Sequence, residues 1–265
     1  MLAEERKNRI MEMLNRNVVV KVNDLSRELK ATEATIRRDL EELQSRKLVC
    51  RIHGGAILPS PTSKPLSRTQ LMVICKKEKI LIAKKAYGFI RENDAILLDS
   101  STTVLELARY IASGSLRNIT VITNSFYVVP LLAENKNVKV LHTGGEVSYD
   151  MDYSTGVITR NMLAGIRADK CFLGANGIDP SFGYSVPTMD DADVKRAMIT
   201  ASKQTFVLAD HTKFGECYMG RFAEFSGQVD YLITDSLPPK IEKKPYDSNV
   251  NLIEAFAGQP AENQV

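Results

Sequence analysis

Several features that mark common protein classes are missing from this sequence of 265 residues. It has no run of about eighteen apolar residues and no signal peptide at its start, so we expect a cytoplasmic protein with no membrane partner. Its four cysteines form no Cys-x-x-Cys motif, and its three histidines lie far apart. Because no local zinc motif is present, we expect neither a metal nor another cofactor. Internal repeats and low-complexity tracts are also missing, which is typical of an ordinary globular protein.

The composition, with 44% hydrophobic and 25% charged residues, supplies enough apolar material for a core. The length exceeds one average domain, so it predicts one large domain or two smaller ones. The formal net charge of +3 is too small to indicate nucleic-acid binding by itself. However, residues 1–58 contain 12 lysines and arginines against 9 aspartates and glutamates, and the two kinds balance in the rest of the chain. This local excess supports contact with phosphate groups by the N-terminal segment.

Residues 23–45 have the pattern of two short helices joined by a tight turn. Residues 23–30 are predicted to form a helix that Asn23 caps and that packs through Leu25 and Leu29. Only two residues separate it from a second helix, which Thr32 is expected to cap. In the second helix, apolar residues recur at the spacing i, i+4, i+7, as Ile36, Leu40 and Leu43. Two helices around so short a turn indicate a helix-turn-helix.

Polar residues lie off the apolar stripe of this second helix, near its N-terminal end. In a helix-turn-helix, this end meets base edges and phosphates in the major groove. We therefore predict DNA contacts from five residues, which are Thr32, Glu33, Thr35, Arg37 and Arg38. The alternative is a solvated amphipathic helix whose arginines form ion pairs with Glu41 and Glu42 at i+4.

A hairpin pattern follows the second helix, with apolar runs over 48–52 and 56–58 around a glycine turn. A hairpin in this position is a wing, and residues 18–22 are predicted to form a strand that pairs with it. We expect Arg51, His53 and Gly54 to touch DNA beside the major groove. The alternative is a purely structural hairpin that closes the domain. Residues 3–14 have helical spacing and precede these elements.

These motifs resemble the winged helix of the DeoR family of bacterial transcriptional regulators. The family signature is Thr-Ile-Arg-Arg-Asp-Leu followed by Arg-x-His-Gly-Gly-Ala, and both halves are present, as Thr35–Leu40 and Arg51–Ala56. The resemblance implies a regulator that binds double-stranded operator DNA. Because winged-helix regulators act on paired half-sites, we expect a homodimer or homotetramer.

Beyond residue 58 the pattern changes to alternating strands and helices. We expect a winged helix over 1–58, a breaker-rich linker over 59–70, an effector domain over 71–258 and a loose tail over 259–265. Helices are predicted over 76–90, 102–112, 128–133 and 191–201. Strands are predicted over 95–99, 119–123, 138–141, 171–174, 206–209 and 229–234. Strands without internal charge that alternate with helices indicate an α/β domain with a mainly parallel sheet covered on both faces.

Polar residues collect where the predicted strands end. In an open parallel sheet, ligands bind outside the carboxyl ends of the strands. The candidate residues there are Asp99, Ser100, Ser101, Thr102, Thr103, Thr123, Asn124, Ser125, Gly144, Gly145, Asp179, Asp210 and Lys213. The loop over 99–103 opens a helix, so its hydroxyl and N–H groups suit an anion. The alternative is that each segment is a routine turn whose Ser, Thr or Asp caps the next helix.

This half resembles the effector domain of the DeoR family, which is related in fold to ribose-phosphate isomerases and coenzyme A transferases. The family pattern has Asp-Ser-Gly-Thr-Thr, Thr-Asn-Ser, Gly-Gly, Gly-Ile-Asp, a helix with Lys and Arg, and Asp-x-x-Lys-Phe-Gly. These fall on Asp99–Thr103, Thr123–Ser125, Gly144–Gly145, Gly177–Asp179, Lys195–Arg196 and Asp210–Gly215. The resemblance implies a phosphorylated sugar or polyol as effector, with the first loop holding its phosphate and Lys195 in the site.

One residue departs from the family pattern, because Ser101 stands where the family has glycine. A side chain there is expected to crowd the approach of the backbone to a ligand and to disfavour a positive φ. It could also add a hydroxyl contact.

The sequence as a whole indicates a two-domain repressor of a carbohydrate uptake or catabolism operon, and not an enzyme. The alternative is a sugar-phosphate isomerase with an accessory winged helix, in which Asp179, Lys195 and Asp210 serve as acid and base. No motif in the sequence requires catalysis.

Overall fold

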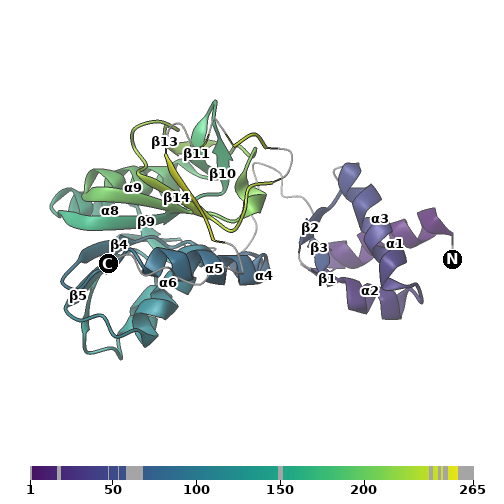
Figure 1. The fold of residues 1–265 in the computed structure, drawn as a ribbon, viewed down its shortest axis with the longest axis horizontal. Helices are drawn as coiled ribbons and strands as arrows, with labels where there is room; N and C mark the ends of the chain where they lie inside the picture. The colour runs from purple at the N-terminus through teal and green to yellow at the C-terminus, as the bar shows by residue number, and fades with distance from the viewer. Residues whose placement is uncertain are drawn as a thin grey trace. The chain divides into compact units, whose positions relative to one another are not determined.

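The computed structural model describes residues 2–16, 19–46, 48–52, 54–57, 68–148, 152–238, 241–243, 246 and 250–255. The chain divides into two compact units, residues 1–75 and residues 76–265 (Figure 1). Each unit has its own hydrophobic core and is described by itself.

The first unit is a winged helix-turn-helix. It contains helices α1 (Ala3–Arg16), α2 (Val22–Glu28), α3 (Glu33–Ser45) and α4 (Arg68–Val73). Strands β1 (Val20–Lys21), β2 (Cys50–Ile52) and β3 (Gly55–Ile57) form an antiparallel sheet in the order β1-β3-β2. The predicted pairing of the strand before α2 with the wing is therefore confirmed.

Two details of this unit differ from the sequence prediction. Helix α2 begins at Val22 without a side-chain cap, so Asn23 does not cap it. The reason is that β1 leads directly into the helix, and the amide of Val22 already donates to the carbonyl of Gly54 at 2.8 Å. Helix α4 begins at Arg68, within the segment expected to be a linker, because 68–73 contains no proline or glycine. The rest of that linker, 59–67, lies outside the described residues.

The core of the first unit confirms the predicted apolar stripes. Leu25 and Leu29 of α2 and its C-terminal turn are buried. Their buried partners from the other elements are Ile10, Leu14, Val20, Ile36, Leu40, Leu43, Val49 and Ala56. Burial of these side chains fixes the helices of the helix-turn-helix against each other and against the wing.

The second unit is built on a seven-stranded sheet in the order β15-β14-β12-β9-β4-β5-β6, and all of its neighbouring pairs are parallel. The strands are β4 (Ala95–Leu98), β5 (Ile119–Thr123), β6 (Val138–His142), β9 (Ala168–Gly174), β12 (Ser202–Leu208), β14 (Tyr231–Thr234) and β15 (Asn251–Glu254). The predicted parallel α/β architecture is confirmed. In the described part of the chain, no helix is long and apolar enough to cross a membrane.

Helices cover both faces of this sheet, as predicted. In Figure 1, α5 (Lys76–Tyr87) and α6 (Thr102–Ser113) lie on one face, and α8 (Gly156–Ala164) and α9 (Met189–Thr200) lie on the other. The short helix α7 (Val128–Leu132) packs against α6 and β6. The 3₁₀ turn η1 (His211–Lys213) follows β12.

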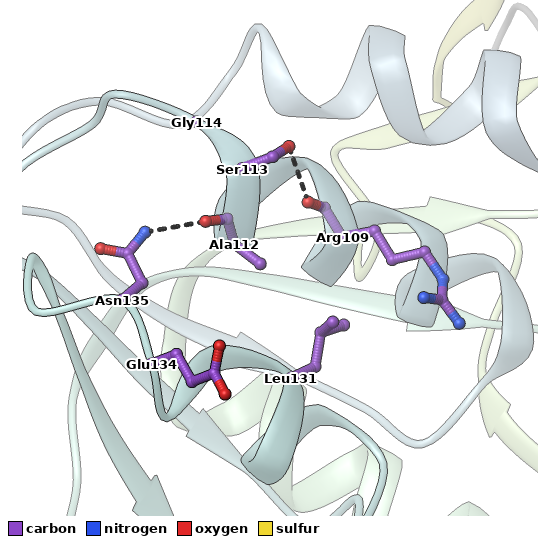
Figure 2. A pocket seen from close by; sticks show the side chains of 7 residues that line it. All are labelled: Arg109, Ala112, Ser113, Gly114, Leu131, Glu134 and Asn135. Atoms are coloured by element: carbon purple, nitrogen blue, oxygen red, sulfur yellow. Dashed lines mark hydrogen bonds between the residues drawn. The ribbon is translucent and has the colours of Figure 1, made fainter.

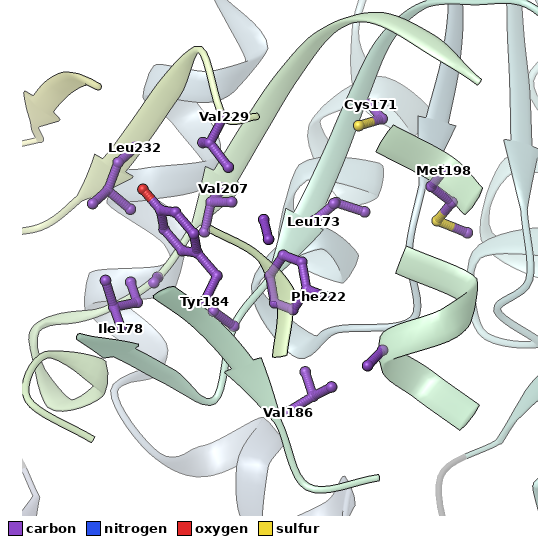
Figure 3. Packing of buried hydrophobic residues seen from close by; sticks show 14 of the residues in the cluster. Cys171, Leu173, Ile178, Tyr184, Val186, Met198, Val207, Phe222, Val229 and Leu232 are labelled. Carbon is purple, nitrogen blue, oxygen red and sulfur yellow. The ribbon is translucent and has the colours of Figure 1, made fainter. Parts of the chain in front are cut away.

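A second, three-stranded sheet was not predicted. Its strands are β10 (Gly177–Asp179), β11 (Gly183–Val186) and β13 (Gly220–Ala223), in the order β10-β11-β13. Figure 3 shows Tyr184 and Phe222 of this small sheet beside Leu173 and Val207 of the large one, within one buried cluster. A further hairpin joins β7 (Glu146–Ser148) to β8 (Tyr153–Thr155).

The strand order reverses between β4 and β9. From β4 the chain proceeds through β5 to β6 on one side, then crosses to β9 on the other side and continues through β12, β14 and β15. Loops that leave neighbouring strands in opposite directions open a crevice at such a point, and ligands of open α/β sheets bind there. The fold thus predicts a ligand-binding site at the carboxyl ends of β4 and β9.

Candidate functional site

Helix α3 begins as the sequence predicted. The hydroxyl of Thr32 accepts a hydrogen bond from the amide of Thr35 at 3.2 Å, and the two threonine hydroxyls lie 2.8 Å apart. Ile36, Leu40 and Leu43 are buried in the core. Burial of this stripe leaves the N-terminal turn of α3 at the surface of the unit, as a recognition helix requires.

The arginines of α3 are exposed and do not form the ion pairs of the alternative interpretation. Arg37 pairs with Glu33 at 3.2 Å, on the N-terminal side, and both side chains are half exposed. Glu41 and Glu42 have other partners, namely Arg51, Lys7 and Arg46. An exposed pair such as Arg37–Glu33 is worth little free energy, so DNA can displace it.

The aspartate of the family signature lies on the buried face of α3, three residues after Ile36 and four before Leu43, and has a structural role. Asp39 is buried and accepts two hydrogen bonds from Arg6 of α1, at 2.5 Å from Nε and 3.0 Å from Nη2. A bidentate pair of this kind fixes both distance and orientation. Asp39 therefore positions the recognition helix against α1.

The wing is attached to α3 through Arg51, which forms an ion pair with Glu41 at 2.7 Å. Gly54 occupies the turn between β2 and β3 and is exposed. Gly55 has no room for a side chain, because a Cβ atom there would lie 2.1 Å from the carbonyl oxygen of Val20 in β1. Gly55 thus lets β1 and the wing approach closely, whereas Gly54 supplies the positive φ of the turn, 79°. His53 lies outside the described residues.

In the second unit, Asp99 occupies the strand-order reversal at the end of β4. Its Oδ1 accepts from the amide of Ser101 at 2.8 Å, and its Oδ2 accepts from the amide of Gly174, at the end of β9, at 2.7 Å. Lys195 of α9 donates to the same Oδ2, and both side chains are buried. The carboxylate therefore joins β4, β9 and α9 at one point.

Lys195 has a second acidic neighbour, Asp191, whose carboxylate lies 3.9 Å from its Nζ. Burial by itself lowers the pKa of Lys195, but the charges of Asp191 and Asp99 outweigh it and raise the pKa above its usual value. Burial and the charge of Asp191 raise the pKa of Tyr153 to about 12, against the opposing charge of Lys195. Lys195 is consequently a charged, fully engaged side chain and holds the loop of Asp99 in place.

Ser101 corrects one expectation. Its φ of −66° and ψ of 152° are extended, so the position requires no positive φ and a serine adopts it without strain. Its hydroxyl caps α6 by accepting from the amide of Val104 at 3.3 Å. The side chain of Ser101 faces Gly174, where a Cβ atom would lie 2.3 Å from the Cβ of Ser101.

The contact between Ser101 and Gly174 predicts that a second substitution can restore stability lost through a first. Gly174→Ala is expected to destabilise the second unit by about 1–3 kcal/mol, because a new side chain is forced into occupied space. The variant Ser101→Gly, Gly174→Ala removes the opposing side chain and should recover more than half of that loss, apart from roughly a few tenths of a kcal/mol for glycine at the cap. Thermal unfolding of the wild type, the two single variants and the double variant measures both the cost of the steric clash and the cost of the missing cap. Equal destabilisation by Gly174→Ala with and without Ser101 would show that the two positions are not in contact.

The ends of β5 and β6 carry further candidates. The side chain of Thr123 accepts from the amide of Ser125 at 3.1 Å, and the amide group of Asn124 donates to the carbonyl of Ser154 at 2.9 Å. The Oδ1 of Asn124 and the hydroxyl of Ser125 are buried without a hydrogen-bond partner among the described residues. Gly144 and Gly145 lie between β6 and β7, and the carbonyl of Gly144 accepts from Thr159 at 2.6 Å. Buried polar atoms without partners usually indicate a water or ligand.

A third group lies at the end of β12. Asp210 is fully buried, and its Oδ1 accepts from the amide of Thr212 at 3.1 Å and from the hydroxyl of the same residue. Its Oδ2 has no partner among the described residues. Burial raises the pKa of Asp210, but the charges of Lys213 and Lys79 overcome this effect, and the pKa lies below its usual value. Asp210 is thus a charged acceptor with two cations close by.

Asp179 is the candidate that lies in the small sheet, and its neighbour Ile178 pairs with Phe214, the residue after Lys213. Asp179 ends β10, where its carboxylate accepts from the amides of Ser181 at 2.8 Å and Phe182 at 3.1 Å, and from the hydroxyl of Ser181. It closes the turn between β10 and β11. The other candidates lie at or beside the carboxyl edge of the large sheet, and Ser100, Thr102 and Thr103 belong to the loop and first turn that follow β4.

A surface hollow elsewhere is distinct from this edge. Its lining residues are Arg109, Ala112, Ser113, Gly114, Leu131, Glu134 and Asn135 (Figure 2). They surround the C-terminal end of α6, whereas Ser101 and the candidate loop lie at its N-terminal end. We therefore do not assign the hollow to the candidate site.

Each of the two units matches a known protein domain. Residues 6–62 match the DeoR-like helix-turn-helix domain, and residues 74–236 match the DeoR C-terminal sensor domain. The chain belongs to the DeoR family. It is 33% identical to the HTH-type transcriptional regulator GolR of Listeria innocua, over 91% of this chain and 93% of GolR. It is 32% identical to the HTH-type transcriptional repressor GlcR of Bacillus subtilis, over 90% of each chain.

Solved structures give weaker likenesses. A D-ribose-5-phosphate isomerase in complex with phospho-erythronic acid has a TM-score of 0.39 and 17% identity, over 52% of this chain and 54% of that chain. The translation initiation factor eIF-2B of Pyrococcus horikoshii has a TM-score of 0.45 and 16% identity, over 83% and 69%. These scores are too low to relate the ligands or the chemistry. Membership of the DeoR family, in contrast, makes the protein a DNA-binding transcriptional regulator.

Proposed function

We propose that this DeoR-family regulator represses genes of carbohydrate uptake or catabolism and is released from operator DNA by a phosphorylated sugar or polyol. The observation that carries the proposal is the set of groups at one sheet edge, where the N-terminus of α6, Lys213 and buried oxygens without partners occur together. The protein would act in the cytoplasm as a homodimer or homotetramer on paired half-sites.

The chemistry of this edge fits a ligand with a phosphate at one end and hydroxyl groups along its length. Lys213 supplies the positive charge that a phosphate requires, and the first turn of α6 supplies N–H and hydroxyl groups for the rest of the ligand. Hydroxyl groups of a sugar can donate to acceptors that lack a partner among the described residues, the Oδ1 of Asn124 and the Oδ2 of Asp210. Asp99 and Lys195 neutralise each other, so we assign them to holding the loop at the end of β4.

The regulatory effect requires a difference in affinity between two states. A ligand that binds the DNA-competent and the released arrangements equally well shifts nothing, however tightly it binds. The effector must therefore favour the released arrangement. The alternative of an isomerase receives less support, because the similar proteins over most of the chain are transcriptional regulators. Incubation with sugar phosphates and an assay for turnover tests it directly.

The double variant Thr102→Ala, Lys213→Ala tests the effector site. Because Ser101 and not Thr102 caps α6, the double substitution keeps the cap of that helix. The melting temperature is measured beside it, because the charge of Lys213 also lowers the pKa of the buried Asp210. It should weaken effector-driven operator release at least tenfold, since it removes a hydroxyl donor and the countercharge of the phosphate. Operator affinity without effector should stay unchanged, which in cells gives a repressor that cannot be induced. The assay is operator release during titration with glucose 6-phosphate, fructose 1-phosphate and sorbitol 6-phosphate.

Lys203→Ala is the matched control, because Lys203 is an exposed lysine of the same sheet that pairs with Asp169. It should respond to the effector as the wild type does. If the double variant is released normally, the assignment of the site is wrong. If instead its melting temperature falls and both activities decline together, the two residues serve the fold and not the effector.

A further inference from the structure

His211, next to the candidate site, is held by two contacts with the carboxylate of Asp235. His211 follows β12, and Asp235 follows the neighbouring strand β14. Both oxygens of Asp235 contact His211: Oδ1 accepts from its backbone amide at 2.8 Å, and Oδ2 lies 2.6 Å from its Nδ1. Asp235 is nearly buried, whereas the imidazole is 40% exposed. The carboxylate therefore fixes a proton on Nδ1 and leaves Nε2 as the nitrogen that can meet a ligand.

The charges around His211 favour its cationic form. The hydrogen bond to Asp235 raises the pKa of His211, and this effect and the charges of Asp235, Asp210 and Glu78 outweigh partial burial. The opposing cations are Lys213 and Lys79, which both act on Asp210. The negative charges thus face His211 from the ends of β12 and β14 and from α5.

The first loop, in contrast, has fewer donors for an anion than the family pattern implies. The amide of Ser101 is engaged by Asp99, and the amide of Val104 is engaged by the hydroxyl of Ser101. With glycine at position 101, that second amide would have no such side-chain partner. The ends of β4 and β12 are two strand spacings apart, about 10 Å. A phosphorylated sugar can therefore place its hydroxyl groups near one end and its phosphate near the other.

We propose that His211, positioned by Asp235, is a second cationic contact beside Lys213 for the phosphate of the effector, and that binding to the form in which this imidazole is neutral is coupled to proton uptake at His211. The buffer supplies this proton to Nε2 of the neutral imidazole, and the resulting N–H donates to a phosphate oxygen. The inference rests on the proposed function, because it names the groups that bind the phosphate in the same site.

The proposal predicts a pH dependence with a definite sign. An anion that binds next to Nε2 stabilises the protonated imidazole, so affinity should be highest at low pH and fall as the pH rises through the pKa of His211. A phosphate ester complicates this test, because it loses its own second proton near pH 6 and then binds better. Inorganic sulfate keeps its charge of −2 through this range and isolates the contribution of the protein.

The experiment is a histidine-selective NMR titration of the full-length protein, with and without sulfate at constant ionic strength. The chain has three histidines, so His53 and His142 provide internal references in the same spectrum. Sulfate should raise the pKa of His211 by about one unit and leave the other two unchanged. By linkage, sulfate should then bind about tenfold more weakly above this pKa than below it. This measurement uses the wild type and so does not depend on the folding of a variant.

Two variants separate contact from positioning. His211→Gln keeps a side-chain N–H but cannot take up a proton, so its sulfate affinity should be about tenfold lower at low pH and independent of pH. Asp235→Asn should remove most of the sulfate-induced change in the His211 pKa, and Asp235→Glu should restore part of it. Both variants should bind operator DNA as the wild type does.

An unchanged His211 titration in sulfate and in inorganic phosphate, while the sugar phosphates still release the operator, overturns this inference and leaves the proposed function standing. If no phosphorylated sugar releases the operator and neither anion binds, both are overturned. If sulfate shifts only His142, the anion site lies at the end of β6, and the assignment to His211 is wrong.

Discussion

Replacement of both Arg37 and Arg38 by alanine is expected to abolish specific operator binding at physiological salt. Both side chains are exposed on the N-terminal half of α3, outside the buried stripe. An arginine that reads a guanine contributes about 1–3 kcal/mol per half-site, and one that meets a phosphate changes the salt slope by about one. In the proposed oligomer each contact is repeated in two half-sites, so the loss of binding free energy is counted twice.

Binding of fluorescent operator DNA at several salt concentrations measures this effect and separates the two kinds of contact. Arg9→Ala on α1 is the matched control, because Arg9 is equally exposed and pairs only locally with Glu12. It should change affinity by less than threefold. Both proteins should unfold at the wild-type temperature, since exposed substitutions alter stability by only about 0.5 kcal/mol. Unchanged affinity and salt slope in the double variant would show that α3 does not read the operator.

Local patterns predicted the first unit closely, because helix caps and apolar spacing act over only a few residues. The cap at Thr32 and the stripe through Ile36 are both present. The pair between Arg6 and Asp39 escaped prediction, because it joins positions 33 residues apart. Asn23 was predicted wrongly as a cap, since the pairing of β1 with the wing moves the start of the helix to Val22.

Most of the large sheet was predictable for a similar reason, because β4, β5, β6, β9, β12 and β14 each contain an apolar run of ordinary length, whereas β15 was not predicted. The small sheet was not. Its strands have three or four residues, and each begins at a glycine, which is typical of turns. Moreover, β13 pairs with β11 across more than thirty residues. Tyr184 and Phe222 are buried in one cluster with residues of the large sheet, and this long-range packing stabilises the short strands.

At the effector site, the sequence predicted the edge of the sheet but not the partners within it. A parallel sheet brings strand ends together, so polar residues after the strands could be grouped in advance. The pairing of Asp99 with Lys195 joins residues 96 positions apart, and Asp235 reaches His211 from 24 positions away. Such contacts depend on strand order, which local patterns do not determine.

The buried pair of Asp99 and Lys195 leads to the largest expected loss of stability. Lys195→Met keeps the length of the side chain but leaves the Asp99 carboxylate without its cation in a buried site. Removal of one partner of a buried ion pair costs about 3–5 kcal/mol. For a unit of this size, each kcal/mol corresponds to about 2–4 °C in melting temperature. The second unit should therefore melt roughly 6–20 °C lower than in the wild type.

The exposed pair of Lys203 and Asp169 provides the control, with the same substitution at the same kind of contact. Its atoms lie 2.8 Å apart, but the lysine side chain is 65% exposed. Lys203→Met should cost less than about 1 kcal/mol.

A double-mutant cycle of Lys195→Met with Asp99→Asn should show a coupling of at least about 1 kcal/mol, because Lys195 and Asp99 interact directly. Calorimetry that resolves the two units should place the whole loss in the second one, since the first has a separate core. Equal losses for Lys195→Met and Lys203→Met would mean that Lys195 does not hold the loop at the strand-order reversal, and that the effector site lacks the rigid base we assign to it.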